Sequence, residues 1–198
     1  KNLSYPTNNN LMQSFKFELL YKSKKSRARV GKIHTPHGII DTPNFVGVGT
    51  NGVIKALDSN TVIALGLQLM FANTYHLMLQ PGTSIVKAAG GIHKFMNRSM
   101  PIITDSGGFQ VFSLSEIRTI DDDGVVFLSH IDGSLHLFTP ERVMEIERAL
   151  GADVIMAFDH CPPGQADRDL ASTASERTLA WLARCRERFD RLLLEDPE

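Results

Sequence analysis

Three short polar clusters follow apolar segments of the sequence and carry the side chains best suited to chemistry. They read NTYH (Asn73 to His76), DSGGF (Asp105 to Phe109) and FDHC (Phe158 to Cys161). An apolar strand that ends in a carboxylate and is followed by two glycines places an acceptor beside bare backbone amides. Because the carboxyl ends of parallel strands share one face of a sheet, three such clusters predict a binding or catalytic site.

The two carboxylates, Asp105 and Asp159, suit the edge of a purine, and of guanine in particular. The N1–H and exocyclic amine of guanine are donors that pair with a carboxylate. Gly107 and Gly108 would let a flat ligand lie against the backbone, and Phe109 would stack on its face. Each residue also has a structural interpretation, since an Asp commonly caps a helix and a Gly pair commonly forms a turn.

The segments around these clusters alternate between strand and helix four times from Pro43 onward. The expected strands are PNFVGVG, LQLMFANTYH, MPIITDSGG and ADVIMAFDHC. Helices are expected from Asp58-Ser59, within TSIVKAAGGIHKFMN, which also holds the exit from that helix, over TPERVMEIERALG with Thr139 as N-cap and Gly151 past the end, and from Asp167 onward. Continuous apolar strands between helices are typical of a parallel sheet buried on both faces.

The remaining segments predict smaller additions to this α/β pattern. Residues 1–14 are expected to be a disordered leader or residues added by cloning. SFKFELLY and the stretch RVGKIHTPHGIIDTPNFV predict antiparallel strands with a turn at Thr35 to Gly38. Between them, KSKKSRAR is interpreted as a solvated turn, with a phosphate contact as the alternative. The insertion DDDGVVFLSHIDGSLHLF predicts a hairpin that turns near Asp132-Gly133.

Composition narrows the class of protein. The 198 residues are 42% hydrophobic and 22% charged, as in a globular domain, and a net charge of −1 shows no overall footprint for nucleic acid. Two cysteines fit a reducing cytoplasm, and no apolar run is long enough to span a membrane. Cys161 and His76 are expected to be structural, and His34 and His37 to lie at the surface. Without CxxC or HExxH spacing, we expect no metal site within this chain.

Four segments together resemble the bacterial form of tRNA-guanine transglycosylase. They are NTYHLMLQPG, PIITDSGGFQVFSL, FLSHIDGS and VIMAFDHCPP, and the resemblance runs in order from about Phe15 to the end. It implies a (β/α)₈ TIM barrel, of which residues 15–198 would supply the first half, an N-terminal antiparallel hairpin and the inserted hairpin. It also implies a structural zinc whose ligands would lie beyond Glu198.

The resemblance further implies an activity and the residues that serve it. The family exchanges the wobble guanine in the anticodon loop of certain tRNAs for 7-aminomethyl-7-deazaguanine, through a covalent glycosyl-enzyme intermediate formed by an aspartate. Asp105 corresponds to the catalytic general acid/base and base-binding aspartate, and Asp159 to the carboxylate that reads the base edge. The other substrate-binding positions are Ser106, Gly107, Gly108 and Phe109.

Two departures from the family pattern limit these expectations. His160 stands where relatives usually carry a glutamate, and a neutral imidazole there could still accept a hydrogen bond. The nucleophilic aspartate would lie beyond Glu198, so we expect this chain alone to be inactive. The full protein is expected to be a cytoplasmic homodimer. Two alternatives remain open: a paralogue that binds 7-deazaguanine or tRNA without catalysis, and an unrelated barrel enzyme acting on a small carbonyl or phosphate substrate.

Overall fold

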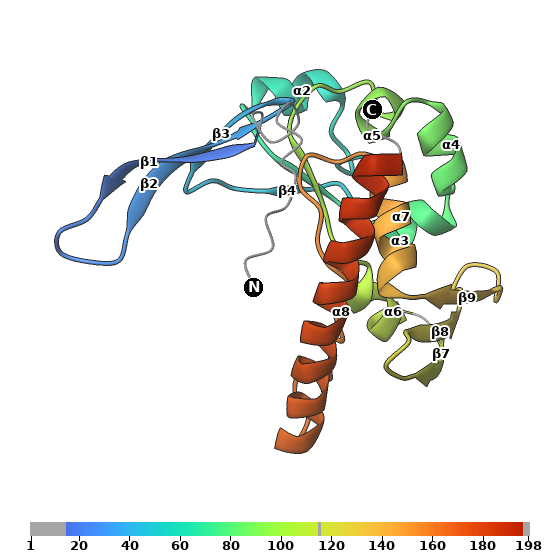
Figure 1. Cartoon of the computed structure of the whole chain (residues 1–198). Helices are drawn as coiled ribbons and strands as arrows, with labels where there is room; N and C mark the ends of the chain where they lie inside the picture. Colours follow the sequence, from blue (N-terminus) through green and yellow to red (C-terminus); the bar gives the residue numbers. More distant parts are fainter. Residues whose placement is uncertain (1–14, 115, 196–198) are drawn as a thin grey trace.

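The computed structural model describes residues 15–114 and 116–195, and Figure 1 shows their arrangement. The predicted leader, residues 1–14, lies outside the described residues. Three three-stranded sheets are present in this part of the chain, one parallel and two antiparallel. The long C-terminal helix runs beside a second helix, and the hairpin of β1 (Lys16–Lys22) and β2 (Arg29–Thr35) extends away from the rest of the molecule (Figure 1).

The parallel sheet carries the predicted strand ends. Its strands are β4 (Gly47–Val48), β5 (Met70–Ala72) and β6 (Ile102–Thr104), in that order. Ala72 lies opposite Thr104, so β5 and β6 end side by side. The fourth predicted strand is much shorter than expected. It joins β6 through one parallel bridge between Ile103 and Val154, and no described residue pairs with its other edge.

The helices are α2 (Ser59–Ala64), α3 (Thr74–Leu79), α4 (Thr83–Ala88), α5 (Ile92–Phe95), α6 (Gly108–Leu114), α7 (Pro140–Leu150) and α8 (Arg168–Glu195). Of these, α2, α7 and α8 begin close to the predicted positions, whereas α3 and α6 follow β5 and β6, where no helix was predicted. Thr139 caps α7 by accepting from the Arg142 amide at 3.1 Å, and Gly151 ends it in the left-handed conformation. The helix predicted within TSIVKAAGGIHKFMN is α4, and the segment after it holds a second short helix, α5, beyond Gly90 and Gly91, which both adopt positive φ.

The two antiparallel sheets match the predicted additions, with one difference. Strands β1 (Lys16–Lys22), β2 (Arg29–Thr35) and β3 (Gly38–Thr42) form the N-terminal sheet. The insertion is a meander of β7 (Glu116–Ile120), β8 (Val125–Leu128) and β9 (Leu135–Phe138), not a two-stranded hairpin. The turn at Asp132-Gly133 is where it was predicted, and β7 adds a strand before it.

Aromatic side chains fill the core between the sheet and the two long helices. Trp181 of α8 is fully buried and stacks on Phe158, with ring centroids 4.8 Å apart. Phe138 meets Phe158 edge to face at 5.7 Å. Burying large rings in this way is a main source of stability, and it holds the segment before Asp159 against α8.

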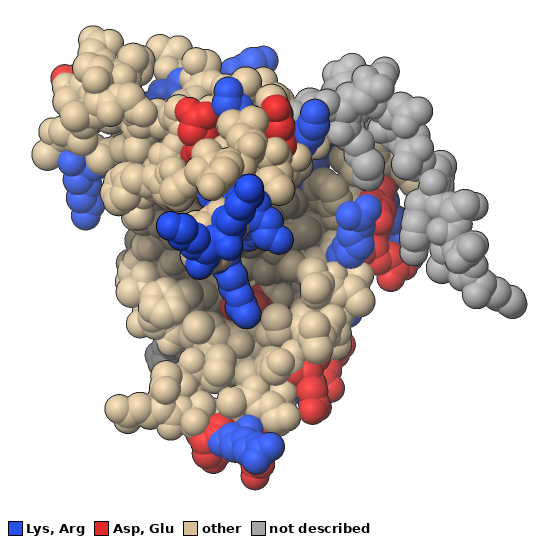
Figure 2. Space-filling view, turned by 90° about the vertical axis from the view of Figure 1, so that its left-hand side faces the viewer, with Lys and Arg blue, Asp and Glu red and all other residues tan. Residues whose placement is uncertain are grey.

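The predicted basic turn is solvent-exposed. Figure 2 shows a group of Lys and Arg side chains on the side from which the β1–β2 hairpin projects. The exposed basic residues of this turn and its flanks are Lys22, Lys24, Lys25, Arg27 and Arg29. Both interpretations, a solvated loop and a phosphate contact, remain consistent with this exposure. No helix within the described ranges is long and apolar enough to cross a membrane.

Candidate functional site

The ends of β5 and β6 bring the first two polar clusters together. Asn73 follows β5 and Asp105 follows β6, and the Asp105 amide donates to the carbonyl of Ala72 at 3.3 Å. Because β5 and β6 are parallel and Ala72 lies opposite Thr104, the residues that follow the two strands must lie next to each other. Asn73 and Thr74, which belong to the first polar cluster, are therefore partners of Asp105.

Three donors fix the orientation of the Asp105 carboxylate. Asn73 Nδ2 donates to Oδ2 at 2.5 Å, while the Thr74 and Gly107 amides donate to Oδ1 at 2.9 Å and 3.2 Å. Charge-assisted bonds of this kind hold a side chain in one rotamer. The structural interpretation of Asp105 was as a helix cap, but Asp105 accepts from the Gly107 amide in a local turn, and Ser106 caps α6 instead. The Asp105 carboxylate is also held in place by the two residues that follow the neighbouring strand, β5.

The turn after Asp105 reaches the second predicted carboxylate. Ser106 Oγ donates to Asp159 Oδ1 at 2.6 Å and accepts from the Gly108 amide at 3.0 Å. The Ser106 hydroxyl thus caps the start of α6 and orients Asp159 at the same time. Among the described residues, no donor meets Asp159 Oδ2. Asp105 and Asp159 consequently flank one turn of the chain.

The two glycines of this turn are required by space and by backbone conformation. A Cβ at position 108 would lie 2.5 Å from Asp159 Oδ1 and 2.7 Å from its carbonyl oxygen. Gly107 adopts φ of +76°, which favours glycine. Because positions 107 and 108 carry no side chain, the backbone can approach Asp159 closely. Phe109, the proposed stacking residue, is 62% exposed and is free to contact a ligand.

A buried acid that the sequence reading overlooked lies behind Asp105. Glu147 of α7 is 0% exposed and touches two hydroxyls, Thr104 Oγ1 at 2.5 Å and Thr74 Oγ1 at 2.9 Å. The Thr74 hydroxyl also lies 2.6 Å from the carbonyl of Asp105. Glu147 was detectable in the sequence, because it follows Val143 and Met144 by four and three residues on the apolar face of its helix.

Proton counting indicates that Glu147 is neutral. Thr74 has one hydroxyl proton, and the carbonyl of Asp105 can only accept it. The contact between Thr74 Oγ1 and Glu147 Oε1 is then satisfied by a proton on the glutamic acid. Burial raises the pKa of Glu147 to about 8, and this effect exceeds the lowering effect of its contacts with the Thr104 and Thr74 hydroxyls. A neutral acid therefore connects α7 to the backbone of Asp105.

His160 lies next to Asp159 and is buried, with 8% of its surface exposed. Arg177 Nη1 lies 3.1 Å from His160 Nδ1, and since a guanidinium can only donate, that nitrogen is the acceptor. Burial and then the Arg177 charge lower the pKa of His160, which favours the neutral ring. We expected that a neutral His160 could accept a hydrogen bond. Its Nδ1 already accepts from Arg177 and its Nε2 carries the proton, so the ring has no further acceptor to offer.

Other polar residues near the site differ in how well they are satisfied. The buried Oε1 of Gln110, on α6, has no hydrogen-bond partner among the described residues. His76 packs edge to face against Tyr75, and burial lowers its pKa. The Cys161 thiol is partly buried, and burial raises its pKa. These contacts agree with structural roles for His76 and Cys161.

Comparison with known proteins identifies the family. A family model described as queuine tRNA-ribosyltransferase matches residues 23–197. The queuine tRNA-ribosyltransferase of Protochlamydia amoebophila is 54% identical over 89% of this chain and 50% of its own length. That of Desulforamulus reducens is 55% identical over 86% and 46%, and that of Halothermothrix orenii 49% identical over 90% and 48%.

The chain spans about half the length of the curated relatives it matches. The match nevertheless includes the three polar clusters and the helices that position them. On this evidence the chain belongs to the queuine tRNA-ribosyltransferase family.

Proposed function

We propose that this chain supplies the base-binding part of a tRNA-guanine transglycosylase. The single observation that supports this most is the Asp105–Gly108 turn, which is flanked by Asp105 and Asp159. In the proposed reaction an aspartate outside this chain attacks C1′ of the wobble nucleotide and guanine departs. 7-Aminomethyl-7-deazaguanine then takes its place and releases the enzyme carboxylate.

Each site residue has a defined task in this proposal. Asp159 accepts the N1–H and exocyclic amine of the base, and its Oδ2, which meets no donor among the described residues, is available for this. Asp105 acts as general acid/base and binds the base edge. Ser106 orients Asp159, while Gly107 and Gly108 let the base approach the backbone, and Phe109 stacks on its face.

The whole protein is proposed to complete a (β/α)₈ barrel, with residues 15–198 as its N-terminal part. Apolar side chains on and beside the parallel sheet support this, because they are unusually exposed in this chain. Phe45 is 76% exposed, Val48 61% and Ile63 73%. Strands and helices that this chain lacks would cover them. The tRNA anticodon loop as substrate, a homodimer and a cytoplasmic location are part of the same proposal.

The structural zinc of the family is proposed to be bound outside this chain. A zinc thiolate site needs deprotonated cysteines that converge. Cys185 instead donates its thiol to the carbonyl of Pro140 at 3.6 Å, and burial raises its pKa to about 11. The pKa of Cys161 is raised as well. The cysteines of this chain therefore do not fit that group.

The test is exchange of labelled guanine into tRNA by the full-length protein. Asp105→Ala and Asp159→Ala are each expected to reduce exchange by about 100-fold or more. Asp132→Ala is the matched control, since Asp132 lies on the exposed β8–β9 turn. Full activity in either of the first two variants would remove that residue from the site. The 198-residue chain alone is expected to show no exchange, and turnover by it would place the nucleophile within it.

A further inference from the structure

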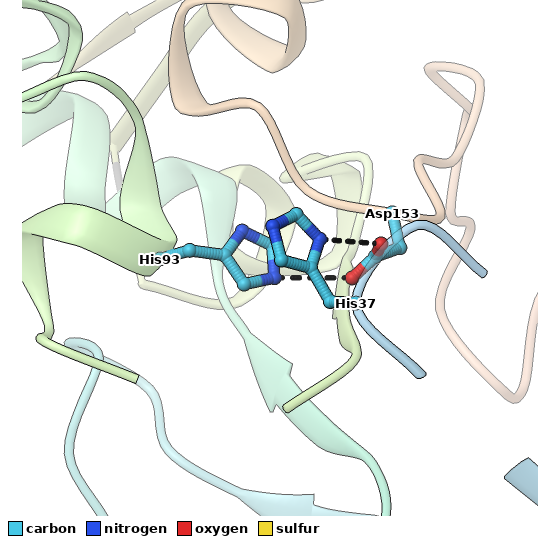
Figure 3. Close-up of side chains that lie close together, drawn as sticks. All are labelled: His37, His93 and Asp153. Carbon is cyan, nitrogen blue, oxygen red and sulfur yellow. Dashed lines mark hydrogen bonds and ion pairs between the residues drawn. The ribbon is translucent and has the colours of Figure 1, made fainter. Parts of the chain in front are cut away.

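Two histidines and an aspartate converge at the end of the parallel sheet opposite the candidate site. His37 lies in the β2–β3 turn, His93 on α5, and Asp153 just before the bridge to β6 (Figure 3). Their ligand-type atoms all lie within 4.8 Å of one another. Since the three residues come from distant parts of the sequence, no local motif could reveal them.

Asp153 holds both imidazoles through its two oxygens. His37 Nδ1 lies 2.8 Å from Oδ1 and His93 Nε2 lies 3.0 Å from Oδ2. The two rings are stacked, with centroids 3.5 Å apart and planes 8° from parallel. Two nitrogen donors and one carboxylate oxygen from three segments thus face one small volume (Figure 3).

The cluster is already arranged for ligation. The Asp153 side chain is 0% exposed and that of His93 is 8% exposed. The Ile102 amide fixes Asp153 Oδ2 by a further bond of 2.9 Å. Together with the bonds to His37 and His93, this contact holds the carboxylate in one position between the two imidazoles.

Solvent reaches the cluster from one side. The His37 side chain is 37% exposed. An open pocket of about 350 Å³ lies against both histidines and is completed by Lys94, Asn97, Arg98 and Ser99. Its volume leaves room for water ligands on an ion held by three protein groups. The charges of Lys94 and Arg98 oppose a cation, although Arg98 Nη1 is directed to Met70 Sδ at 3.9 Å.

We propose that His37, His93 and Asp153 form a binding site for a divalent transition-metal ion of the zinc class. Two imidazoles and a carboxylate are a donor set that such ions prefer. On binding, each imidazole gives up its hydrogen bond to Asp153, carries its proton on the other ring nitrogen and gives the freed lone pair to the ion. The rings open from their parallel stack so that both nitrogens reach the ion at about 2.0–2.2 Å.

This site departs from the expectation that no metal binds within the chain, which rested on motif spacing alone. It contains no cysteine, so it is also separate from the structural zinc proposed to lie outside this chain. An ion there would fasten the β2–β3 turn to the start of β6 and to α5. Its existence does not depend on the proposed base exchange.

The test is zinc titration of the full-length protein by calorimetry, with bound zinc counted by mass spectrometry after gel filtration. We expect the wild type to bind one equivalent more than His37→Gln or His93→Gln, whose affinity falls by about 10-fold or more. His34→Gln is the matched control, because His34 lies on the same hairpin but pairs with Glu18. His37 is partly exposed, so His37→Gln keeps the test decisive if His93→Gln fails to fold.

Lys94→Gln separates a cation site from an anion site in the same pocket. Removal of a positive charge tightens zinc binding if the proposal is right. A parallel titration with inorganic phosphate should give no binding that depends on His37. Equal zinc stoichiometry in the wild type and both histidine variants would overturn the proposal. So would phosphate binding that weakens in both Lys94→Gln and His37→Gln.

Discussion

Two buried carboxyl groups contact opposite ends of strand β6 and differ in charge, because Glu147 is neutral and Asp153 is ionised. Glu147 contacts Thr104, the last residue of the strand, and Asp153 contacts the amide of Ile102, the first. Both side chains are enclosed by protein. The pKa of Glu147 is raised to about 8, whereas the pKa of Asp153 is lowered to about 2.

The difference lies in the partners and not in the burial. Burial disfavours the charged form of both acids. Asp153 meets two imidazole nitrogens and an amide, all able to donate, and these outweigh the cost of burial. Glu147 meets only hydroxyls, one of which already gives its proton to the carbonyl of Asp105. At one end of the strand Asp153 is therefore an ionised carboxylate, and at the other end Glu147 is a neutral acid behind the candidate active site.

The largest effect is expected from removal of the charged acid. Asp153→Ala leaves His37, His93 and the Ile102 amide without their acceptor in a buried position. We expect the free energy of unfolding of the full-length protein to fall by on the order of 3 kcal/mol. Urea denaturation at pH 7 measures this. A loss below about 1 kcal/mol would show that the imidazoles are satisfied without the carboxylate.

Replacement of the neutral acid should cost less. Glu147→Leu leaves the Thr74 and Thr104 hydroxyls poorly paired, so unfolding becomes easier by about 2 kcal/mol. Exchange activity should fall as well, because the backbone of Asp105 loses its support. Glu147→Gln is the matched variant, since an amide can both donate and accept as the neutral acid does. Equal damage by Glu147→Gln and Glu147→Leu would contradict a neutral hydrogen-bonding role.

The two acids should also give stability opposite dependences on pH. The folded pKa of Glu147, about 8, lies above the ordinary value of 4.5 for a glutamate, so its contribution to stability is complete below pH 4.5 and is lost as pH rises through 8. For Asp153 the pKa falls from 3.8 to about 2, so its contribution is present above 3.8 and is lost as pH falls through 2.

Unfolding free energies from pH 5 to 8 test the Glu147 half of this contrast. Relative to Glu147→Gln, the wild type should lose up to about 1.4 kcal/mol per pH unit as the pH rises. Asp132→Asn, at an exposed turn, should keep the wild-type slope. Parallel curves for the wild type and Glu147→Gln would mean that Glu147 does not change its proton affinity on folding.

The smallest effect is expected from the hydroxyl that orients Asp159. Ser106→Ala removes the 2.6 Å bond to Asp159 and the cap on the Gly108 amide. A hydrogen bond of this kind contributes about 1 kcal/mol, which corresponds to a roughly fivefold higher KM for guanine. The measurement is steady-state exchange with varied guanine. A change in kcat alone would indicate a role other than holding Asp159.

The sequence predicted the strand ends better than the residues behind them. Asp105 and Asp159 can be singled out in the sequence because each follows an apolar segment, although their roles in a site stay predictions. Glu147 was treated as one more residue of an amphipathic helix, although its position on the apolar face distinguishes it. His37 was interpreted only as a surface residue, and it is exposed, but its contact with Asp153 spans 116 positions of sequence. Long-range pairing of this kind leaves no periodic signal.

The prediction of secondary structure from the sequence failed where contacts between distant segments decide the local conformation. Gly90 and Gly91 separate α4 from α5, a second short helix in a segment predicted only as a helix and its exit, and their positive φ values could not be read from apolar periodicity. The strand before Asp159 pairs only at Val154, because its other edge has no partner among the described residues. Capping at Thr139 and the turn at Asp132 depend on adjacent residues, and both were predicted correctly.

The central claim is that Asp105 and Asp159 bind one edge of a purine. Discrimination between two purine bases tests this claim most directly. Hypoxanthine lacks the exocyclic amine that Asp159 is proposed to accept. The measurement is the ratio of kcat/KM for guanine to that for hypoxanthine in exchange by the full-length protein. We predict a strong preference for guanine in the wild type and in Asp132→Asn, and a ratio near one in Asp159→Asn. A wild-type ratio in Asp159→Asn would contradict the account.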